Sequence, residues 1–198
     1  MSYTKKTLLD LQQYLADKHD SGSLPTDSST LAYWTRLLNN AQDYIADRLK
    51  LVKSTDLTTV SGIIALPDDF ISIKSVIVDD EIELAQIDKE DSGGVTGNVF
   101  WIKGNHYDGF SLNVPSDDTF NVYYVYNIAP LVDTGDICII PDPITVAIYA
   151  YAKLRQAETD PLEDANQSLG EAEARIRSMI ENRITNDGDL SFTLNENA

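Results

Sequence analysis

Cysteine is almost absent from this chain of 198 residues, which contains one, Cys138. A single cysteine forms no intrachain disulfide, so the disulfide scaffold of small secreted proteins is excluded. Its neighbours are Ile137, Ile139 and Ile140, and no cation lies close to it in sequence. We therefore expect Cys138 to be a small buried apolar residue rather than a reactive thiol.

Long apolar runs are missing as well. No window approaches the ~20 apolar residues that a membrane-spanning helix needs. Near the N-terminus, Asp10, Gln12 and Gln13 interrupt the apolar positions, and no small-residue cleavage site follows, so the segment does not resemble a signal peptide. We expect no membrane association, and we expect the protein to be made and kept in a cytoplasm.

Positive charge is scarce. The chain has 15 Lys and Arg against 32 Asp and Glu, a net charge of −17, and no Lys or Arg occurs from Gly104 to Ala152. A free-standing DNA-binding module normally has a basic patch, because phosphate contacts supply most of its affinity. The acidic balance suits solubility, and it also suits a surface that DNA must pass without binding.

Residues suited to catalysis are few. His19 and His106 both lie in sequence typical of loops, and neither has a second ligand at metal-binding spacing. Carboxylates cluster in three predicted turns: Asp68-Asp69, Asp79-Asp80-Glu81 and Asp117-Asp118. Paired carboxylates serve glycosidases, but among 32 acidic residues such pairs arise by chance. The sequence predicts no catalytic residue, no cofactor and no metal site.

Helical periodicity dominates the first part of the chain. One helix is predicted from about Lys5 to Asp17. A second, of about 22 residues, follows the N-cap candidates Asp27, Ser28 and Ser29. Its apolar stripe consists of Leu31, Trp34, Leu38, Ala41, Ile45 and Leu49. The cations Arg48, Lys50 and Lys53 are predicted at its C-terminal end, where they suit the helix dipole.

Strand patterns follow, from about Leu57 to Ile140. The predicted strands are 63–66, 71–78, 81–87, a hairpin of 99–102 with 110–114, and 120–126. In the last of these, Phe120, Val122, Tyr124 and Tyr126 share one face.

Helices return after Pro141. Asp142 is the predicted cap and Pro143 the first helical residue. A final helix is predicted from near Pro161 to near Arg183. The fold class is therefore α+β: a helical bundle formed by both chain ends, with an inserted small antiparallel β-sheet module. We expect one composite domain over residues 1–184, with helical parts at about 5–50 and 142–184 and the insertion at about 57–140.

The C-terminal arm, residues 185–198, has strand periodicity. Leu190, Phe192 and Leu194 alternate with Ser191 and Thr193, but a single short strand is not stable alone. One interpretation is a frayed terminus. The other is an arm that orders on assembly, with Leu190, Phe192 and Leu194 as candidate partner-binding residues.

Several short motifs occur in a characteristic order over about residues 5 to 184. They are Asn39-Asn40-Ala41-Gln42, Leu66-Pro67-Asp68-Asp69-Phe70, Trp101-Ile102-Lys103-Gly104, Leu112-Asn113-Val114-Pro115, Val122-Tyr123-Tyr124-Val125-Tyr126, Ala129-Pro130-Leu131 and Ile140-Pro141-Asp142-Pro143. In this order and spacing the chain resembles the head–tail adaptor (connector, head-completion) proteins of tailed bacteriophages. The acidic segment 79–97 departs from the family's pattern.

The resemblance implies a structural virion protein without a catalytic site or cofactor. It implies a homo-oligomeric ring, usually of twelve subunits, that docks on the portal protein at the neck of the virion. Such a ring extends the DNA channel, lets DNA pass without specific binding, and offers a platform to the next neck or tail-completion protein. The protein would be made in the host cytoplasm.

Three other readings stay open at this point. The chain could be another ring protein of the same particle, such as a stopper or tail-completion protein. It could be a carbohydrate-binding or receptor-binding module that uses Trp101 and the tyrosines. It could also be a hydrolase built on paired aspartates.

Overall fold

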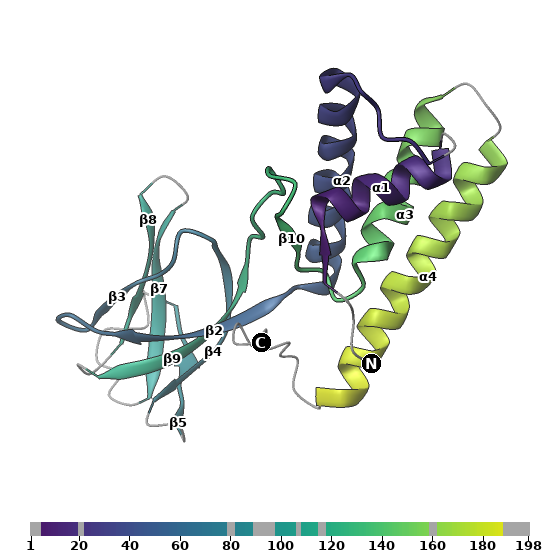
Figure 1. Cartoon of the computed structure of the whole chain (residues 1–198). Coiled ribbons are helices and arrows are strands. Elements are labelled where there is room, and N and C mark those ends of the chain that lie inside the picture. Colours follow the sequence, from purple (N-terminus) through teal and green to yellow (C-terminus); the bar gives the residue numbers. More distant parts are fainter. Residues whose placement is uncertain are drawn as a thin grey trace. The chain divides into compact units, whose positions relative to one another are not determined.

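The computed structural model describes residues 5–19, 22–78, 82–88, 98–105, 108–114, 118–158 and 162–187. The fold is α+β, and the chain divides into two compact units (Figure 1). Unit 1 consists of Met1–Lys50 and Ile128–Asp189, and unit 2 of Leu51–Asn127 and Leu190–Ala198. The strand-rich part was expected at about 57–140. The main segment of the β unit is Leu51–Asn127, and residues 128–140 belong to the helical unit.

Unit 1 contains the four helices found among the described residues. They are α1 (Leu8–His19), α2 (Ser28–Leu49), α3 (Pro143–Ala157) and α4 (Leu162–Asp187). Helix α3 contacts the other three, and it is buried along most of its length, including Val146, Ala147 and Ala150. None of the described helices is long and apolar enough to cross a membrane.

The bounds predicted for helix α2 are confirmed. The Asp27 side chain accepts a hydrogen bond from the Thr30 backbone N–H at 2.7 Å, so it is the N-cap. The helix ends at Lys50, which takes a left-handed backbone conformation (φ 49°) and donates its N–H to the Ala46 carbonyl. Of the predicted stripe, Trp34, Leu38, Ala41, Ile45 and Leu49 are buried, and Leu31 is half-buried.

Helix α1 begins later than predicted, at Leu8 rather than about Lys5. Thr7 and Asp10 cap it reciprocally: the Thr7 N–H donates to the Asp10 carboxylate at 3.0 Å, and the Asp10 N–H to the Thr7 hydroxyl at 3.2 Å. Lys6 and Thr7 instead form strand β1. The helix continues through His19, two residues beyond the predicted end.

Helices α3 and α4 match the prediction at one end and differ at the other. Asp142 stands at the N-cap position of α3 and Pro143 is its first residue, as predicted. Helix α4 runs through Asp187, so the predicted end near Arg183 is wrong. The remainder of the arm, with Leu190, Phe192 and Leu194, lies outside the described residues.

Unit 2 contains two four-stranded sheets where one small antiparallel sheet was expected. The first has the order β2 (Val52–Thr58), β9 (Thr119–Tyr126), β4 (Phe70–Val78) and β5 (Ile82–Glu83). The second has the order β3 (Ile63–Ala65), β8 (Gly109–Asn113), β7 (Val99–Asn105) and β6 (Ala85–Gln86). Strands β6 and β7 pair in parallel, so the second sheet is mixed.

The predicted hairpin is the antiparallel pair β7–β8, and the strands predicted over 63–66, 71–78 and 120–126 are present. The single strand predicted over 81–87 is wrong, because β5 and β6 are separate strands that belong to different sheets. Strand β9 lies between β2 and β4, so the alternating face with Phe120, Val122 and Tyr124 is buried. Strand β2 was not predicted. It contains Lys53, so the assignment of that residue to the end of the preceding helix is wrong.

Candidate assembly surfaces

The residues from Ile128 to Cys138, here called the clamped segment, are held against α2 by side-chain amides. Asn39 makes two hydrogen bonds to Leu131: its Nδ2 donates to the Leu131 carbonyl at 2.9 Å, and its Oδ1 accepts from the Leu131 N–H at 2.7 Å. Gln42, one turn further along α2, donates to the Ala129 carbonyl at 3.1 Å. The Leu131 side chain is buried. Three backbone groups of this non-strand stretch are thus paired by side chains of α2.

The other half of the clamped segment is fixed to the start of α1. Strand β10 (Ile137–Cys138) pairs antiparallel with β1 (Lys6–Thr7). The N–H groups of Leu8 and Leu9 donate to the carbonyls of Asp136 and Thr134, at 2.8 and 3.1 Å. Backbone bonds from two elements therefore hold this half.

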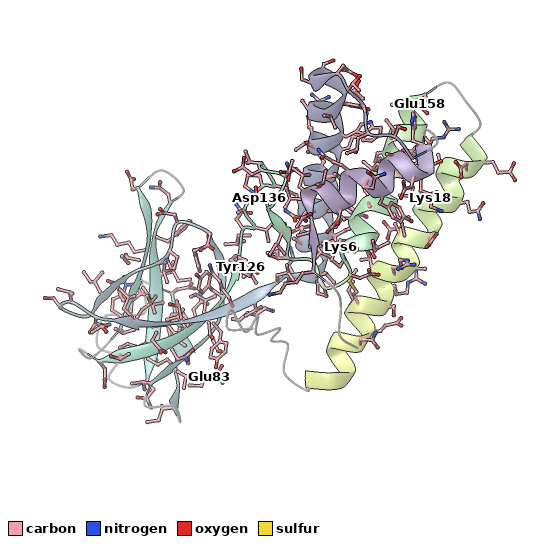
Figure 2. The ribbon with its side chains drawn as sticks, in the orientation of Figure 1. Lys6, Lys18, Glu83, Tyr126, Asp136 and Glu158 are labelled. Carbon is pink, nitrogen blue, oxygen red and sulfur yellow. The ribbon has the colours of Figure 1, made fainter. Side chains whose placement is uncertain are left out.

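The turn between these halves is closed by one carboxylate, labelled in Figure 2. Asp136 Oδ2 accepts from the backbone N–H groups of Val132 and Asp133, each at 2.7 Å. These two hydrogen bonds lower the pKa of Asp136. The turn is thus held by a side chain that bonds back to the backbone three and four residues earlier.

This well-tethered segment presents apolar side chains to solvent. Val132 is 71% exposed, Ile137 48% and the adjoining Leu9 44%. We call these three residues the apolar patch. Single exposed apolar residues are ordinary, but a group of them on a fixed segment is typical of a surface that meets a partner.

A second surface of unit 1 is aromatic and charged. The rings of Tyr44 (α2) and Tyr149 (α3) stack at 4.7 Å. Arg48 and Lys153 lie over these two rings, at 5.6 and 5.3 Å from their centroids. Glu173 of α4 accepts from the Tyr44 hydroxyl at 2.7 Å and pairs with Arg48 at 3.1 Å. Tyrosine and arginine are enriched at protein interfaces, so this cluster is also a candidate contact surface.

Unit 2 has an exposed apolar turn of its own. Val60, 77% exposed, and the half-exposed Ile63 bracket Ser61 and Gly62. Both central residues have positive φ, 56° and 71°, as a two-residue hairpin turn of this kind requires. A Cβ at Gly62 would lie 2.9 Å from the Val114 carbonyl oxygen, so glycine is needed there.

The acidic pairs show no catalytic arrangement among the described residues. Asp69 pairs with Lys53 at 2.5 Å and accepts from the Tyr124 hydroxyl at 3.3 Å. Lys53 also lies 5.5 and 4.8 Å from the ring centroids of Tyr124 and Tyr126. Burial disfavours the charge on Lys53, but hydrogen bonds to Asp69 and Tyr124 outweigh it and raise its pKa. Asp69 therefore has a structural role, joining its own motif to strand β2 through Lys53 and to strand β9 through Tyr124.

The aromatic residues considered for sugar binding differ in their burial. Tyr124 and Tyr126 are buried, so their ring faces are closed to a sugar. Trp101 and Tyr123 are half-buried. The clusters Asp79-Asp80-Glu81 and Asp117 lie outside the described residues.

His19 is not in a loop, as its sequence context suggested, but is the last residue of α1. Its Nε2 lies 2.5 Å from the Glu158 carboxylate, and its ring meets the edge of Trp34 at 6.0 Å. Burial opposes ionisation of Glu158, but hydrogen bonds from His19 and Arg155 outweigh it and lower its pKa. The pair joins the ends of α1 and α3. His106 lies outside the described residues, and within them no three metal-binding side chains gather.

Cys138 is buried in β10, as predicted. Burial raises the pKa of its thiol to about 11. The residue is an apolar core member rather than a nucleophile.

The described part of the chain thus offers an apolar and an aromatic surface, which suit a protein that works by contact with other proteins. The family model of the SU10 adaptor protein matches residues 6–193, and the chain belongs to this family of phage head–tail adaptors. No curated protein matches the chain. Membership confirms the resemblance drawn from the order of the motifs, and it implies a structural component of the virion neck that interacts with other head or neck proteins.

The structure also explains motifs whose role the sequence left open. Asn39-Asn40-Ala41-Gln42 and Ala129-Pro130-Leu131 meet through the hydrogen bonds of Asn39 and Gln42. A local signal for this exists, because both amides stand beside the apolar stripe of α2, three residues apart. Their partner, however, is about 90 residues further along the chain.

Proposed function

We propose that the chain is one subunit of a homo-oligomeric ring, of twelve copies, that docks on the portal protein. The ring extends the DNA channel and provides the platform for the next neck or tail-completion protein. The observation on which this rests is the family match over residues 6–193. The exposed apolar patch supports it, because a ring subunit needs surfaces for its neighbours.

The helical bundle formed by both chain ends is, in this proposal, the rigid body of the subunit, and the β module is an insertion into it. Hydrogen bonds that link the first 50 residues to the last part of the chain support the idea. Tyr44 and Arg48 of α2 bond to Glu173 of α4, and His19 of α1 bonds to Glu158 beyond α3. Because of such links, the folding of each end of the chain depends on contacts with the other end.

The charge of the chain suits a channel wall. At −17 per subunit, twelve copies together have a formal charge of about −204 before counterions bind. Phosphates find few cations on such a surface, so DNA passes along it without being held. The ring acts by binding and positioning, with no catalytic step and no cofactor.

Native mass spectrometry of the protein with purified portal tests the proposal. A complex with a fixed number of copies, and a ring in two-dimensional class averages of that complex, is expected. A stopper or tail-completion protein would bind the assembled neck but not the bare portal. A chain that stays monomeric beside portal at micromolar concentrations would contradict the proposal.

The arm with Leu190, Phe192 and Leu194 is proposed to order only on assembly, against a neighbouring subunit or the portal. Because α4 runs through Asp187, the informative deletion begins at residue 188. Removing 188–198 should leave the melting temperature of the monomer nearly unchanged and weaken ring or portal binding. Equal assembly of the shortened and complete chains would show that the arm has no role in assembly.

A further inference from the structure

Strand β10 has an edge whose backbone groups are unpaired in the described residues. In the β1–β10 ladder the Leu8 N–H donates to the Asp136 carbonyl, so the next hydrogen-bonded pair is Lys6 with Cys138. Ile137 lies between these pairs, opposite Thr7, and its N–H and C=O therefore point away from β1. The two-stranded sheet ends there.

The side chains around this edge are apolar and exposed. Ile137 itself is 48% exposed, and Val132 and Leu9 complete the apolar patch beside it. Exposed edges are normally protected by charge, proline or a bulge. Here an unpaired backbone lies next to bare isoleucine and valine, which is the arrangement that accepts an added strand.

The size of the patch points to a short segment rather than to a second globular surface. A stable contact between folded proteins buries about 800 Å² on each partner. Three aliphatic side chains that are already partly covered offer only a few hundred Å². A peptide strand needs less apolar area, because backbone hydrogen bonds add to its affinity.

One segment of this same chain has the matching chemistry. Residues 190–194 alternate Leu, Phe and Leu with Ser and Thr, so an extended strand would place its apolar side chains on one face. The segment belongs to the part of the chain that follows α4, which runs through Asp187. Its alternating apolar pattern therefore complements the apolar patch.

We propose that residues Leu190–Leu194 of one copy add as a strand to the free edge of β10 in a second copy, with their apolar face on Leu9, Val132 and Ile137. Every copy then has one donor arm and one acceptor edge, and such a head-to-tail contact closes into a ring when the rotation permits. The inference rests on the proposed function and names the partner of the apolar patch within it.

Disulfide trapping in the full-length chain tests the pairing. In a Cys138→Ala background, Ile137→Cys is combined in turn with a cysteine at each position from 190 to 195, and the protein is mixed with purified portal and oxidised. Ile137 would be a hydrogen-bonded partner of the arm, with its Cα about 5.5 Å from the opposite Cα, which a disulfide can span. We expect cross-linked multimers whose yield alternates along the arm with a period of two, as only a strand would give.

The outcomes separate this inference from the proposed function when the same samples are imaged. Rings on portal together with alternating intermolecular cross-links support both. Rings without such cross-links, or with cross-links only inside one chain, overturn the strand exchange and leave the ring. Absence of both rings and cross-links overturns both.

A pair of substitutions at Val132 gives a readout that does not depend on disulfides. Because Val132 is 71% exposed, neither Val132→Ser nor Val132→Ile should change the fold. Losing the burial of one such side chain should weaken association between copies about tenfold in Val132→Ser. Val132→Ile keeps the apolar contact and should associate like the unchanged protein. Equal association constants for the two variants would overturn the assignment of the patch.

Discussion

Replacing Asn39 with alanine removes both hydrogen bonds that fix Leu131 to helix α2. A typical intramolecular hydrogen bond contributes about 0.5–1.5 kcal/mol net, so the two together contribute about 1–3 kcal/mol. A backbone group left without a partner away from water costs about 1–3 kcal/mol more. The clamp is partly buried, so water replaces some of what is lost, and we expect the free energy of unfolding to fall by about 2–4 kcal/mol.

The neighbouring residue supplies the matched control. Asn40 lies on the same helix and is exposed, so Asn40→Ala changes only helix propensity and should gain up to about 0.7 kcal/mol. The difference between the two alanine variants therefore measures the clamp. Asn39→Asp keeps the acceptor for the Leu131 N–H but loses the donor, and should fall between them.

Urea denaturation followed by far-ultraviolet circular dichroism measures these differences, since the helices of unit 1 dominate the signal. If Asn39→Ala and Asn40→Ala unfold at the same urea concentration with the same slope, the clamp contributes nothing and the reasoning is refuted. If only Asn39→Ala also loses assembly on portal, the clamp additionally holds the apolar patch in its binding geometry.

Three further predictions concern the core, the cysteine and the charge. Leu38→Ala and Ile176→Ala, both fully buried, should each cost about 2–5 kcal/mol within one cooperative transition; separate melting of N-terminal and C-terminal fragments would argue against this. The thiol of Cys138, with its pKa raised to about 11, should resist alkylation at pH 8, where only about 0.1% is thiolate; labelling as fast in native buffer as in urea would contradict its burial. The free protein should not retain linear duplex DNA on a filter at ~150 mM salt, given its net charge of −17, and tight retention would disprove the reading of the charge.

Several elements could be predicted from the sequence because their signals are local. The cap at Asp27 and the stripe from Trp34 to Leu49 define α2 within one stretch of the chain. Pro143 marks the start of α3, and the alternation from Phe120 to Tyr126 marks β9. Caps, helical stripes and strand alternation depend on residues a few positions apart, so no tertiary partner is needed to read them.

The sequence also predicted the family, but not a site for its contacts. The order of short motifs led to the adaptor resemblance that the family match confirms. The candidate arm residues Leu190, Phe192 and Leu194 remain a prediction, since they lie outside the described residues. The apolar patch was missed because Leu9, Val132 and Ile137 are each ordinary in their own sequence context.

Only the tertiary structure decided the features that join distant parts of the chain. Strand β2 has mostly polar residues after Val52, and it is a strand because it pairs with β9, some 60 to 70 residues away. The two sheets and the parallel β6–β7 pair likewise follow from pairings that no local pattern specifies. The same holds for Asn39: its amide has no local partner, and its role as the clamp on Leu131 exists only because the fold brings residue 131 to α2. Local periodicity determines which segments are helix or strand, whereas backbone pairing between remote segments determines which surfaces the folded protein presents.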